Sequence, residues 1–239
     1  MLGKNKTYLI EPRGKFSTKF GTYDFSKNKP KVGKRIKIGK EPFTIVEPNI
    51  NDFLFRSAKR LPQIVLPKDV SMIIAFTGCS PKWNVVDAGT GSGFMSIVLA
   101  NIIKPGKVFT YEKRKDFFEK ANNNIKNSGL KNIINKNKDF TKGVSNKDID
   151  LVTLDMEHSE KAVKVAEKIL KPGGYLAVYS MHTEQLSKVS TEIRKHNFTE
   201  PIIIENIQRN WKAESSNSKS WTRPKGEDHS VFLTFARKI

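Results

Sequence analysis

The segment Val85–Phe94, with the sequence VVDAGTGSGF, constrains the fold of this chain more than any other segment. Two β-branched residues and an acid precede a turn with three alternating glycines, and an apolar pattern with helical spacing begins at Phe94. This order predicts a strand, a tight turn and a helix, the nucleotide-binding unit of an α/β sheet. Glycine suits such a turn because it adopts unusual backbone angles and lets a ligand approach the main chain. The residues that we expect around that ligand are Asp87, Gly89, Thr90, Gly91, Ser92 and Gly93.

The spacing of the glycines indicates which ligand the turn accepts. A dinucleotide-binding turn has the pattern G-x-G-x-x-G/A, and here the large Phe94 occupies the place of its last small residue. The pattern G-x-G-x-G, with Asp87 two residues before it, resembles motif I of class I methyltransferases that depend on S-adenosylmethionine (SAM). A second acid, Glu112, ends a predicted strand about 20 residues after the glycines, where a ribose-binding acid is expected. The resemblance implies SAM as the cofactor, and Phe94 disfavours a dehydrogenase.

Strands and helices alternate from residue 83 onward. Strands are predicted at 107–112, 133–134, 149–155, 175–180, 202–204 and 231–236, helices at 115–127, 159–170 and 183–196, and a mobile loop at 212–228. This order predicts an α/β fold with the Rossmann-like, seven-stranded sheet of class I methyltransferases. Ligands bind at the carboxyl ends of the strands in such sheets. Four acids lie at or just after predicted strand ends: Asp87, Glu112, Asp139 and Asp155.

The first 82 residues differ from this pattern. Residues 1–50 contain short extended patterns at 7–10, 21–25 and 35–39, and predict a small β-rich domain with a basic outer face. Residues 51–82 predict a helical linker, with helices around 51–55 and 69–77. Residues 83–239 predict the SAM-dependent methyltransferase domain. The N-terminal domain either covers the main domain or holds RNA, and both roles remain open.

The charge of the chain indicates the class of partner. Lys and Arg number 43 against 24 Asp and Glu, a formal net charge of +19, which favours a polyanion such as RNA. A biased genome, or the lysine enrichment of thermophile proteins, would produce a similar surplus. Within the N-terminal domain, Lys34 and Arg35 are the candidate substrate contacts.

Several protein classes are disfavoured. The chain has no apolar run of about 18 residues, so we expect no membrane span, and its first residues lack the apolar stretch of a signal peptide. The single cysteine, Cys79, excludes an internal disulfide and a cysteine metal cluster, and the four histidines lack metal-ligand spacing. We therefore expect a cytoplasmic protein that holds no metal.

Segments outside the glycine turn carry a more specific resemblance. Residues 63–69 are QIVLPKD, 111–117 YEKRKDF, 170–174 LKPGG, 183–185 TEQ, 223–224 RP and 233–238 LTFARK. Together they resemble the tRNA (adenine-N1)-methyltransferase family of the TrmI type. The resemblance implies a homotetramer that binds tRNA and transfers a methyl group from SAM to N1 of a T-loop adenine, at tRNA position 58 with 57 as a second candidate. It also implies that Gln63 and Lys113 contact the cofactor and that Arg223 contacts the substrate.

The loop after the fourth predicted strand departs from the family pattern of D-L-P followed by P-W. Asp155 keeps the acid, but Met156, Glu157 and His158 follow it. We expect Asp155 to accept a hydrogen bond from the adenine N6 amino group and to stabilise developing positive charge. The alternative for Asp155 is a cofactor-pocket or loop-capping carboxylate. His158 is expected either in the base pocket or as a solvated loop residue.

Two further assignments keep an alternative. We expect Asp139 to accept a hydrogen bond from the adenine amino group of the cofactor, and a helix or turn cap is its other role. Arg223 contacts RNA or the cofactor side of the pocket, or else forms a structural salt bridge.

Other functions are compatible with the same motifs. A catalytically silent RNA-binding subunit would also be basic, and cofactor binding distinguishes it from an enzyme. A methyltransferase that acts on another RNA base or on protein would share the glycine turn and Glu112. The N-P-P-Y type tetrapeptide of exocyclic amino methylases is absent after the fourth strand, which disfavours N6 of adenine and N4 of cytosine as targets.

Overall fold

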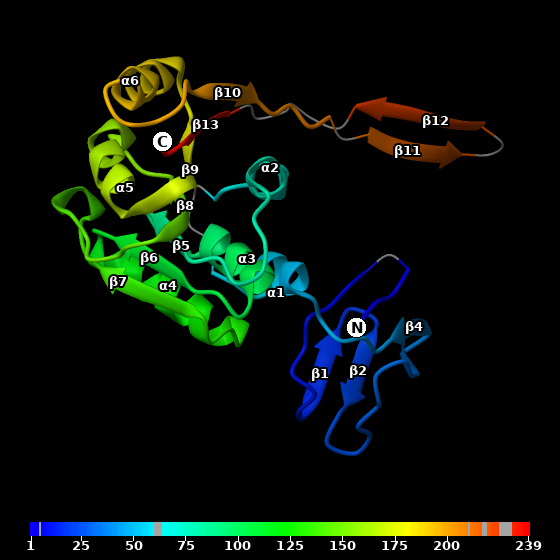
Figure 1. Ribbon diagram of the computed structural model, residues 1–239. Helices are drawn as coiled ribbons and strands as arrows, with labels where there is room; N and C mark the ends of the chain where they lie inside the picture. The colour runs from blue at the N-terminus through cyan, green and yellow to red at the C-terminus, as the bar shows by residue number, and fades with distance from the viewer. Residues whose placement is uncertain (5, 60–63, 210, 217–218, 225–230) are drawn as a thin grey trace. The chain divides into compact units, whose positions relative to one another are not determined.

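The chain forms two compact units, residues 1–59 and 60–239 (Figure 1). The computed structural model describes residues 1–4, 6–59, 64–209, 211–216, 219–224 and 231–239, with the main chain alone described for 212–216 and 219–224. The three-part division at residues 50 and 82 stays a prediction. None of the described helices has the length and apolarity that crossing a membrane requires.

The larger unit is built on one seven-stranded sheet, with the strand order β10-β13-β9-β8-β5-β6-β7. Strands β5 to β9 pair in parallel, β13 runs antiparallel to both β9 and β10, and β10 therefore runs in the same direction as the five. The predicted α/β fold with a seven-stranded methyltransferase sheet is therefore confirmed. The strands are β5 (Val85–Ala88), β6 (Val108–Glu112), β7 (Ile133–Asn137), β8 (Ile149–Leu154), β9 (Leu170–Ser180), β10 (Ile202–Glu205) and β13 (Phe232–Arg237).

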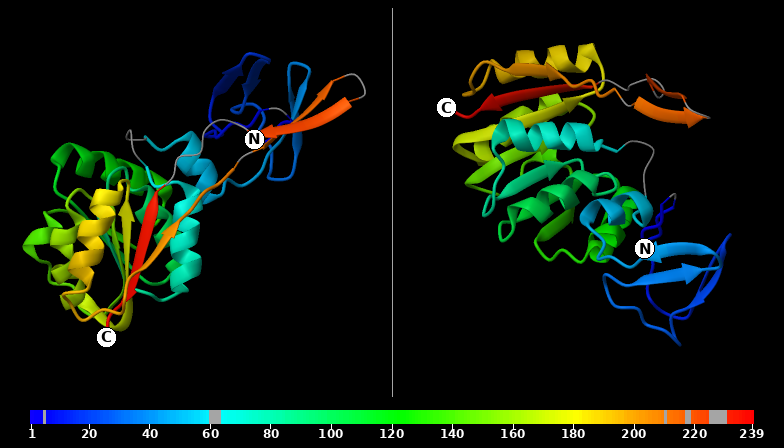
Figure 2. Two further views of the ribbon diagram at one scale, coloured as in Figure 1. Left: turned by 90° about the horizontal axis from the view of Figure 1, so that it is seen from above. Right: turned by 90° about the vertical axis from the view of Figure 1, so that its right-hand side faces the viewer.

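Helices cover both faces of this sheet (Figure 2). Every residue of β8 is buried, as expected for a central parallel strand. Its side chains alternate between two cores: Leu151 packs with α2 and α3, and Val152 packs with α5 and α6. The helices are α2 (Pro67–Thr77), α3 (Phe94–Ile103), α4 (Lys115–Ser128), α5 (Val163–Ile169) and α6 (Thr183–Ile193), with short 3-10 helices η1 (Phe140–Lys142) and η2 (Ser159–Ala162).

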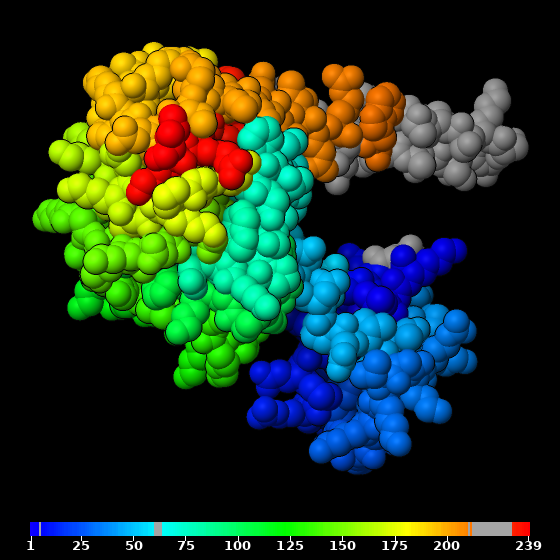
Figure 3. All heavy atoms as spheres, in the orientation of Figure 1, coloured from blue at the N-terminus to red at the C-terminus, as the bar shows by residue number. Residues whose placement is uncertain are grey.

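Helix α2 packs against β13, the antiparallel strand of the sheet. Phe76 stacks on Phe235 of β13 with ring centroids 4.2 Å apart. In Figure 3 the surface of α2 (cyan) adjoins that of the C-terminal strand (red). The helix begins at Pro67, two residues before the predicted start, because proline is favoured in the first helical turn.

Two predicted elements differ from the structure. The predicted helix 159–170 is a 3-10 turn followed by α5, and Leu170 already begins β9 because it pairs with Ile149 of β8. The predicted loop at 212–228 is wrong for most of its length. An antiparallel hairpin, β11 (Trp211–Ser216) with β12 (Lys219–Pro224), occupies this segment, and residues 217–218 and 225–228 lie outside the described residues. The polar composition of the segment predicts a loop. Strand pairing, however, depends on main-chain hydrogen bonds, which a polar sequence can also form.

The smaller unit consists of two hairpins and one short helix. Strand β1 (Lys15–Thr18) pairs with β2 (Gly21–Asp24), and β3 (Arg35–Ile38) pairs with β4 (Glu41–Thr44). The predicted strand at 7–10 is wrong, since Thr7 forms only an isolated bridge with Leu2. Helix α1 (Ile50–Arg56) begins with a capping box between Asn49 and Asp52. The core of this unit contains Met1, Phe25, Ile36, Ile38 and Phe43.

Candidate functional site

A cavity of about 600 Å³ opens at the carboxyl ends of the parallel strands. Its wall is built from the residues that end or follow β5, β6, β7, β8 and β9, as the sheet topology requires. The volume lies within the usual range for small-molecule sites. The predicted site residues that line it are Gly89, Gly91, Glu112, Lys113, Asp139, Asp155 and His158.

The glycine turn brings its main chain to the cavity. Gly91 has a φ of +55°, in the region that favours glycine, and a Cβ placed there would meet no atom within 4 Å. A Cβ on Gly89 would lie 3.3 Å from the carbonyl oxygen of Asp155 and 3.5 Å from Oε2 of Glu112. Gly89 therefore permits close packing of the turn against Asp155 and Glu112. Gly91 permits the positive φ angle of the turn.

Glu112 is held by the main chain on both sides. The Gly91 amide donates a hydrogen bond of 3.0 Å to Oε2, and the Arg114 amide donates one of 3.0 Å to Oε1. The side chain is buried, yet it lines the cavity. Its carboxylate is thus fixed in place before any ligand binds, with lone pairs left for ligand hydroxyls.

Asp87 lies beneath the cavity and is not one of its lining residues. Its carboxylate accepts hydrogen bonds from the hydroxyls of Ser96, Thr153 (2.8 Å) and Thr110 (3.2 Å). Burial raises the pKa of Asp87, against the lowering effect of those hydrogen bonds. These contacts let Asp87 support the turn, and its direct contact with the cofactor stays a prediction.

Three other residues of the turn also face away from the cavity. The Thr90 hydroxyl lies 2.7 Å from the Thr110 hydroxyl, Ser92 is buried, and Gly93 is the N-cap residue of α3 with a φ of +83°. None of the three lines the cavity. Direct cofactor contact by these three residues stays a prediction.

Asp155 is fixed against the glycine turn by its own main chain. Its amide donates to the carbonyl oxygen of Ala88 at 2.6 Å, and the Gly89 amide donates to its carbonyl oxygen at 3.2 Å. Burial raises the pKa of the Asp155 carboxyl to about 7, and the charges of Asp87 and Glu112 add to the rise. At neutral pH this carboxyl can therefore either accept or donate a proton.

Asp139 has a capping role in the structure. Its Oδ1 accepts hydrogen bonds from the Thr141 amide (3.0 Å) and the Thr141 hydroxyl (2.7 Å) at the start of η1. The hydroxyl hydrogen bond is the main cause that lowers the pKa of Asp139, so the group is ionised at neutral pH. Its Oδ2 accepts no hydrogen bond from the described residues, and Asp139 lines the cavity. The cap and a ligand contact are therefore compatible.

His158 borders the opening of the cavity in a left-handed backbone conformation, with a φ of +59°. Its ring lies between two carboxylates: Nε2 is 3.6 Å from Glu157 and Nδ1 is 3.4 Å from Glu160. The side chain is 54% exposed, so it can reach an incoming ligand.

Sequence reasoning assigned no site role to four residues at the end of β9 and just after it. Tyr179, Met181, His182 and Gln185 line the cavity beside Asp155. Burial and the nearby charge of Asp155 raise the pKa of Tyr179, which keeps the phenol protonated. Their position in the sequence was the available signal. They end or follow a parallel strand, and ligands bind at the carboxyl ends of such strands.

Four other predicted site residues are absent from the described lining of this cavity. Gln63 lies outside the described residues, and for Arg223 the structure describes only its main chain in β12. Lys34 and Arg35 are exposed at the start of β3 in the N-terminal unit. Their roles stay predictions. Within the described ranges, no group of three His, Cys, Asp or Glu side chains could hold a metal ion.

Comparison with known proteins places this geometry among methyltransferases. The family model described as the GCD14 subunit of the tRNA methyltransferase complex matches residues 57–231. The tRNA (adenine(57)-N(1)/adenine(58)-N(1))-methyltransferase TrmI of Methanocaldococcus jannaschii is 30% identical, over 98% of this chain and 92% of that protein.

Two solved structures resemble the whole chain. A SAM-dependent O-methyltransferase from Thermotoga maritima has a TM-score of 0.83 at 26% identity, covering 99% of this chain and 91% of that one. The tRNA (m1A58) methyltransferase TrmI of Aquifex aeolicus has a TM-score of 0.80 at 24% identity, covering 100% and 95%, and supports the fold.

Proposed function

This chain belongs to the tRNA methyltransferase family of GCD14 and TrmI, and we propose that it transfers a methyl group from SAM to N1 of adenine 58 in tRNA, with adenine 57 as a second target. The observation that carries the proposal is the placement of Asp155. Its main chain is hydrogen-bonded to the glycine turn, so the proposed base-binding acid and the proposed cofactor acids share one cavity.

The residues of the cavity fit SAM. Glu112, held by two main-chain amides, is suited to accept hydrogen bonds from ribose hydroxyls. The Oδ2 atom of Asp139 is suited to accept one from the adenine amino group. The open side of Gly91 lets a ligand approach the main chain. When bound, SAM supplies a methyl group activated by its sulfonium.

The main task of the protein in this reaction is to align adenine N1 with the methyl group and the sulfur of SAM. Adenine N1 carries an in-plane lone pair, and the base gains positive charge as the new N–C bond forms and the S–C bond breaks. The Asp155 carboxylate accepts a hydrogen bond from the N6 amino group, which orients N1 and stabilises that charge in a partly buried site. The target base has to leave its stack in the tRNA to reach the cavity.

Two features favour a second candidate function, which is methyl transfer to an oxygen atom of a protein. The loop Met156–His158 lacks the family's prolines and tryptophan, and the Thermotoga maritima structure is described as an O-methyltransferase. An oxygen acceptor on a protein would place a different group beside Asp155. The homotetramer implied by the family resemblance also stays a prediction.

The test is methyl transfer from labelled SAM to an unmodified tRNA transcript, with nucleoside analysis of the product. We expect 1-methyladenosine, and its loss when A58 and A57 are replaced by G. Transfer to protein but not to tRNA would favour the second candidate. Failure to bind SAM would leave a silent RNA-binding subunit.

A further inference from the structure

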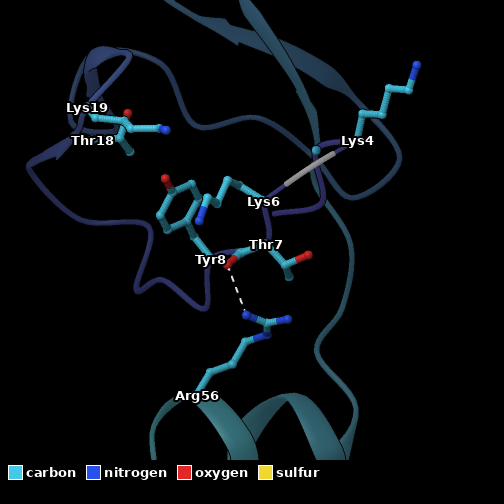
Figure 4. Close-up of a pocket in the computed structure, with 8 residues that line it drawn as sticks. Lys4, Lys6, Thr7, Tyr8, Thr18, Lys19 and Arg56 are labelled. Carbon is cyan, nitrogen blue, oxygen red and sulfur yellow. Dashed lines mark hydrogen bonds between the residues drawn. The ribbon is translucent and has the colours of Figure 1, made fainter. Parts of the chain in front are cut away.

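A second cavity lies wholly within the N-terminal unit and has no role in the methyl-transfer site (Figure 4). Its volume is about 760 Å³, and it is open to solvent. Four cations and one aromatic ring line it, and none of its lining residues is acidic: Lys4, Lys6, Tyr8, Lys19 and Arg56. The unit as a whole has 14 Lys and Arg against five Asp and Glu. An anionic ligand is therefore favoured at this cavity.

Arg56 is held at the base of the cavity. Its Nη1 donates a hydrogen bond of 3.1 Å to the carbonyl oxygen of Thr7, and its Nε lies 3.7 Å from Asp52 one helical turn earlier. Figure 4 shows Arg56 reaching from α1 toward Thr7 and Tyr8, with Lys6 beside the tyrosine ring. Thr18 and Lys19 lie on the opposite side, while Lys4 points away. The Lys19 ammonium lies 5.0 Å from the centroid of the Phe20 ring. Lys6, Lys19 and Arg56 line the same cavity as Tyr8, without an ion-pair partner among its lining residues.

The ring of Tyr8 is fixed by its neighbours. Its centroid lies 5.5 Å from that of Phe16 in an edge-on arrangement and 5.7 Å from that of Phe43. The main chain is held as well, because the Tyr8 amide donates to the carbonyl oxygen of Met1 (2.9 Å) and the Met1 amino terminus donates back to that of Tyr8 (2.8 Å). A half-buried aromatic ring held in this way can stack on a base with little loss of conformational entropy.

We infer that this cavity binds one unpaired nucleotide of the RNA substrate, other than the methylated adenine. The base stacks on Tyr8, and the phosphate lies among Lys6, Lys19 and Arg56. Aromatic stacking beside cations is how proteins hold unpaired nucleotides, and it tolerates any base because every base has a π face. The inference rests on the proposed function, which supplies tRNA as the substrate.

The experiment compares two double variants of the full chain. Lys6→Ala/Lys19→Ala removes two cavity cations, and Lys27→Ala/Lys29→Ala removes two exposed lysines of the same unit that do not line the cavity. Dissociation constants for tRNA are measured over a range of salt concentrations, alongside SAM affinity. We expect the cavity variant to bind tRNA at least tenfold more weakly, with its log–log salt slope reduced by about 1 to 2. The control should change by less than threefold, and neither should change SAM affinity.

A second pair of variants tests the stacking. Tyr8→Phe keeps the ring and should bind tRNA like the wild type, while Tyr8→Leu should bind about tenfold more weakly. Circular dichroism melting reports whether Tyr8→Leu still folds, and the lysine variants test the inference independently of it.

The outcomes separate this inference from the proposed function. If the wild type methylates tRNA but both lysine variants lose affinity equally, the unit has only a diffuse basic surface and the inference is wrong. The same holds if the cavity variant binds like the wild type. If the wild type neither binds nor methylates tRNA, the proposed function fails and this inference fails with it.

Discussion

Gln185 donates a hydrogen bond from its Nε2 atom to the carbonyl oxygen of Met156, at 3.1 Å, across 29 residues of sequence. Its Oε1 atom accepts a hydrogen bond from the Met181 amide at 3.2 Å. One side chain therefore links the loop after β8 to the segment after β9, and both border the cavity. Because Met156 follows Asp155 directly, its hydrogen bond with Gln185 holds the loop that positions Asp155 in the cavity.

Replacing Gln185 should slow methyl transfer without weakening SAM binding. In Gln185→Glu the acceptor for Met181 remains, but the ionised side chain has no donor for the Met156 carbonyl. We expect both Gln185→Glu and Gln185→Ala to lower kcat by about tenfold, with the Kd for SAM within about threefold, because an unmade hydrogen bond costs about 1 to 3 kcal/mol. Ser187→Ala, an exposed position on the same helix, is the control. Equal kcat for all three variants would show that the link is not needed for the reaction.

Replacing Asp155 should abolish turnover while leaving the cofactor bound. Asp155→Ala removes the proposed acceptor for the N6 amino group, and we expect a loss of roughly 10²- to 10⁴-fold in kcat. The Kd for SAM, measured by calorimetry, should stay within about tenfold. Unchanged turnover would remove Asp155 from the mechanism.

The pKa of Asp155, about 7, predicts a pH dependence of activity in the neutral range. Only the ionised carboxylate has the negative charge that stabilises the positive charge developing on the base, so kcat/KM should rise about tenfold per pH unit below pH 7 and level off above it. The profile is measured with both substrates far below saturation, where it reports the free enzyme. A flat profile through pH 7 would contradict the assignment.

The same group predicts a pH dependence of stability. The folded-state pKa of Asp155 lies above its ordinary value of 3.8, so the folded protein binds more protons than the unfolded chain between those two values. Its contribution to the free energy of unfolding is therefore present at low pH and is lost as the pH rises through about 7. Urea unfolding of Asp155→Asn should show a flatter dependence than the wild type over this range. Parallel curves for the two proteins would argue against the raised pKa.

Replacing Glu112 should weaken SAM binding and leave tRNA binding intact. In Glu112→Gln the amide nitrogen can no longer accept a hydrogen bond from one of the two main-chain donors, Gly91 or Arg114. We expect the Kd for SAM to rise at least tenfold, because hydrogen bonds to a charged group are worth about 1.5 to 3 kcal/mol. Asp116→Asn, an exposed acid on α4 outside the cavity, is the matched control. Loss of tRNA affinity in Glu112→Gln would point to a wider collapse of the site.

Parts of the candidate site were predictable because their signals are local. Gly91 and Gly93 have the positive φ values that an alternating glycine turn implies, and Glu112 ends its strand where the spacing placed it. The parallel topology then brings Glu112, Asp139 and Asp155 to one edge, as their positions at strand ends indicated.

Other features depend on partners that are distant in sequence. Asp87 occupies the motif position of a cofactor acid, but hydroxyls from α3, β6 and β8 surround its carboxylate below the cavity. The hairpin of β11 and β12 has no apolar alternation to mark it, and its strands exist through pairing with each other. The link from Gln185 to Met156 likewise joins the first turn of α6 to the loop after β8, and no local pattern relates the two.

The sequence by itself determined the α/β class, the glycine turn, the acids at the strand ends and the basic character of the N-terminal unit. These follow from periodicity, glycine content and charge, which act within a few residues of chain. Only the tertiary structure decided which acids face the cavity, why the pKa of Asp155 lies near 7, and that Tyr8, Lys6, Lys19 and Arg56 border one cavity. Burial, desolvation and the meeting of side chains depend on how distant segments pack, and that packing is a property of the whole fold.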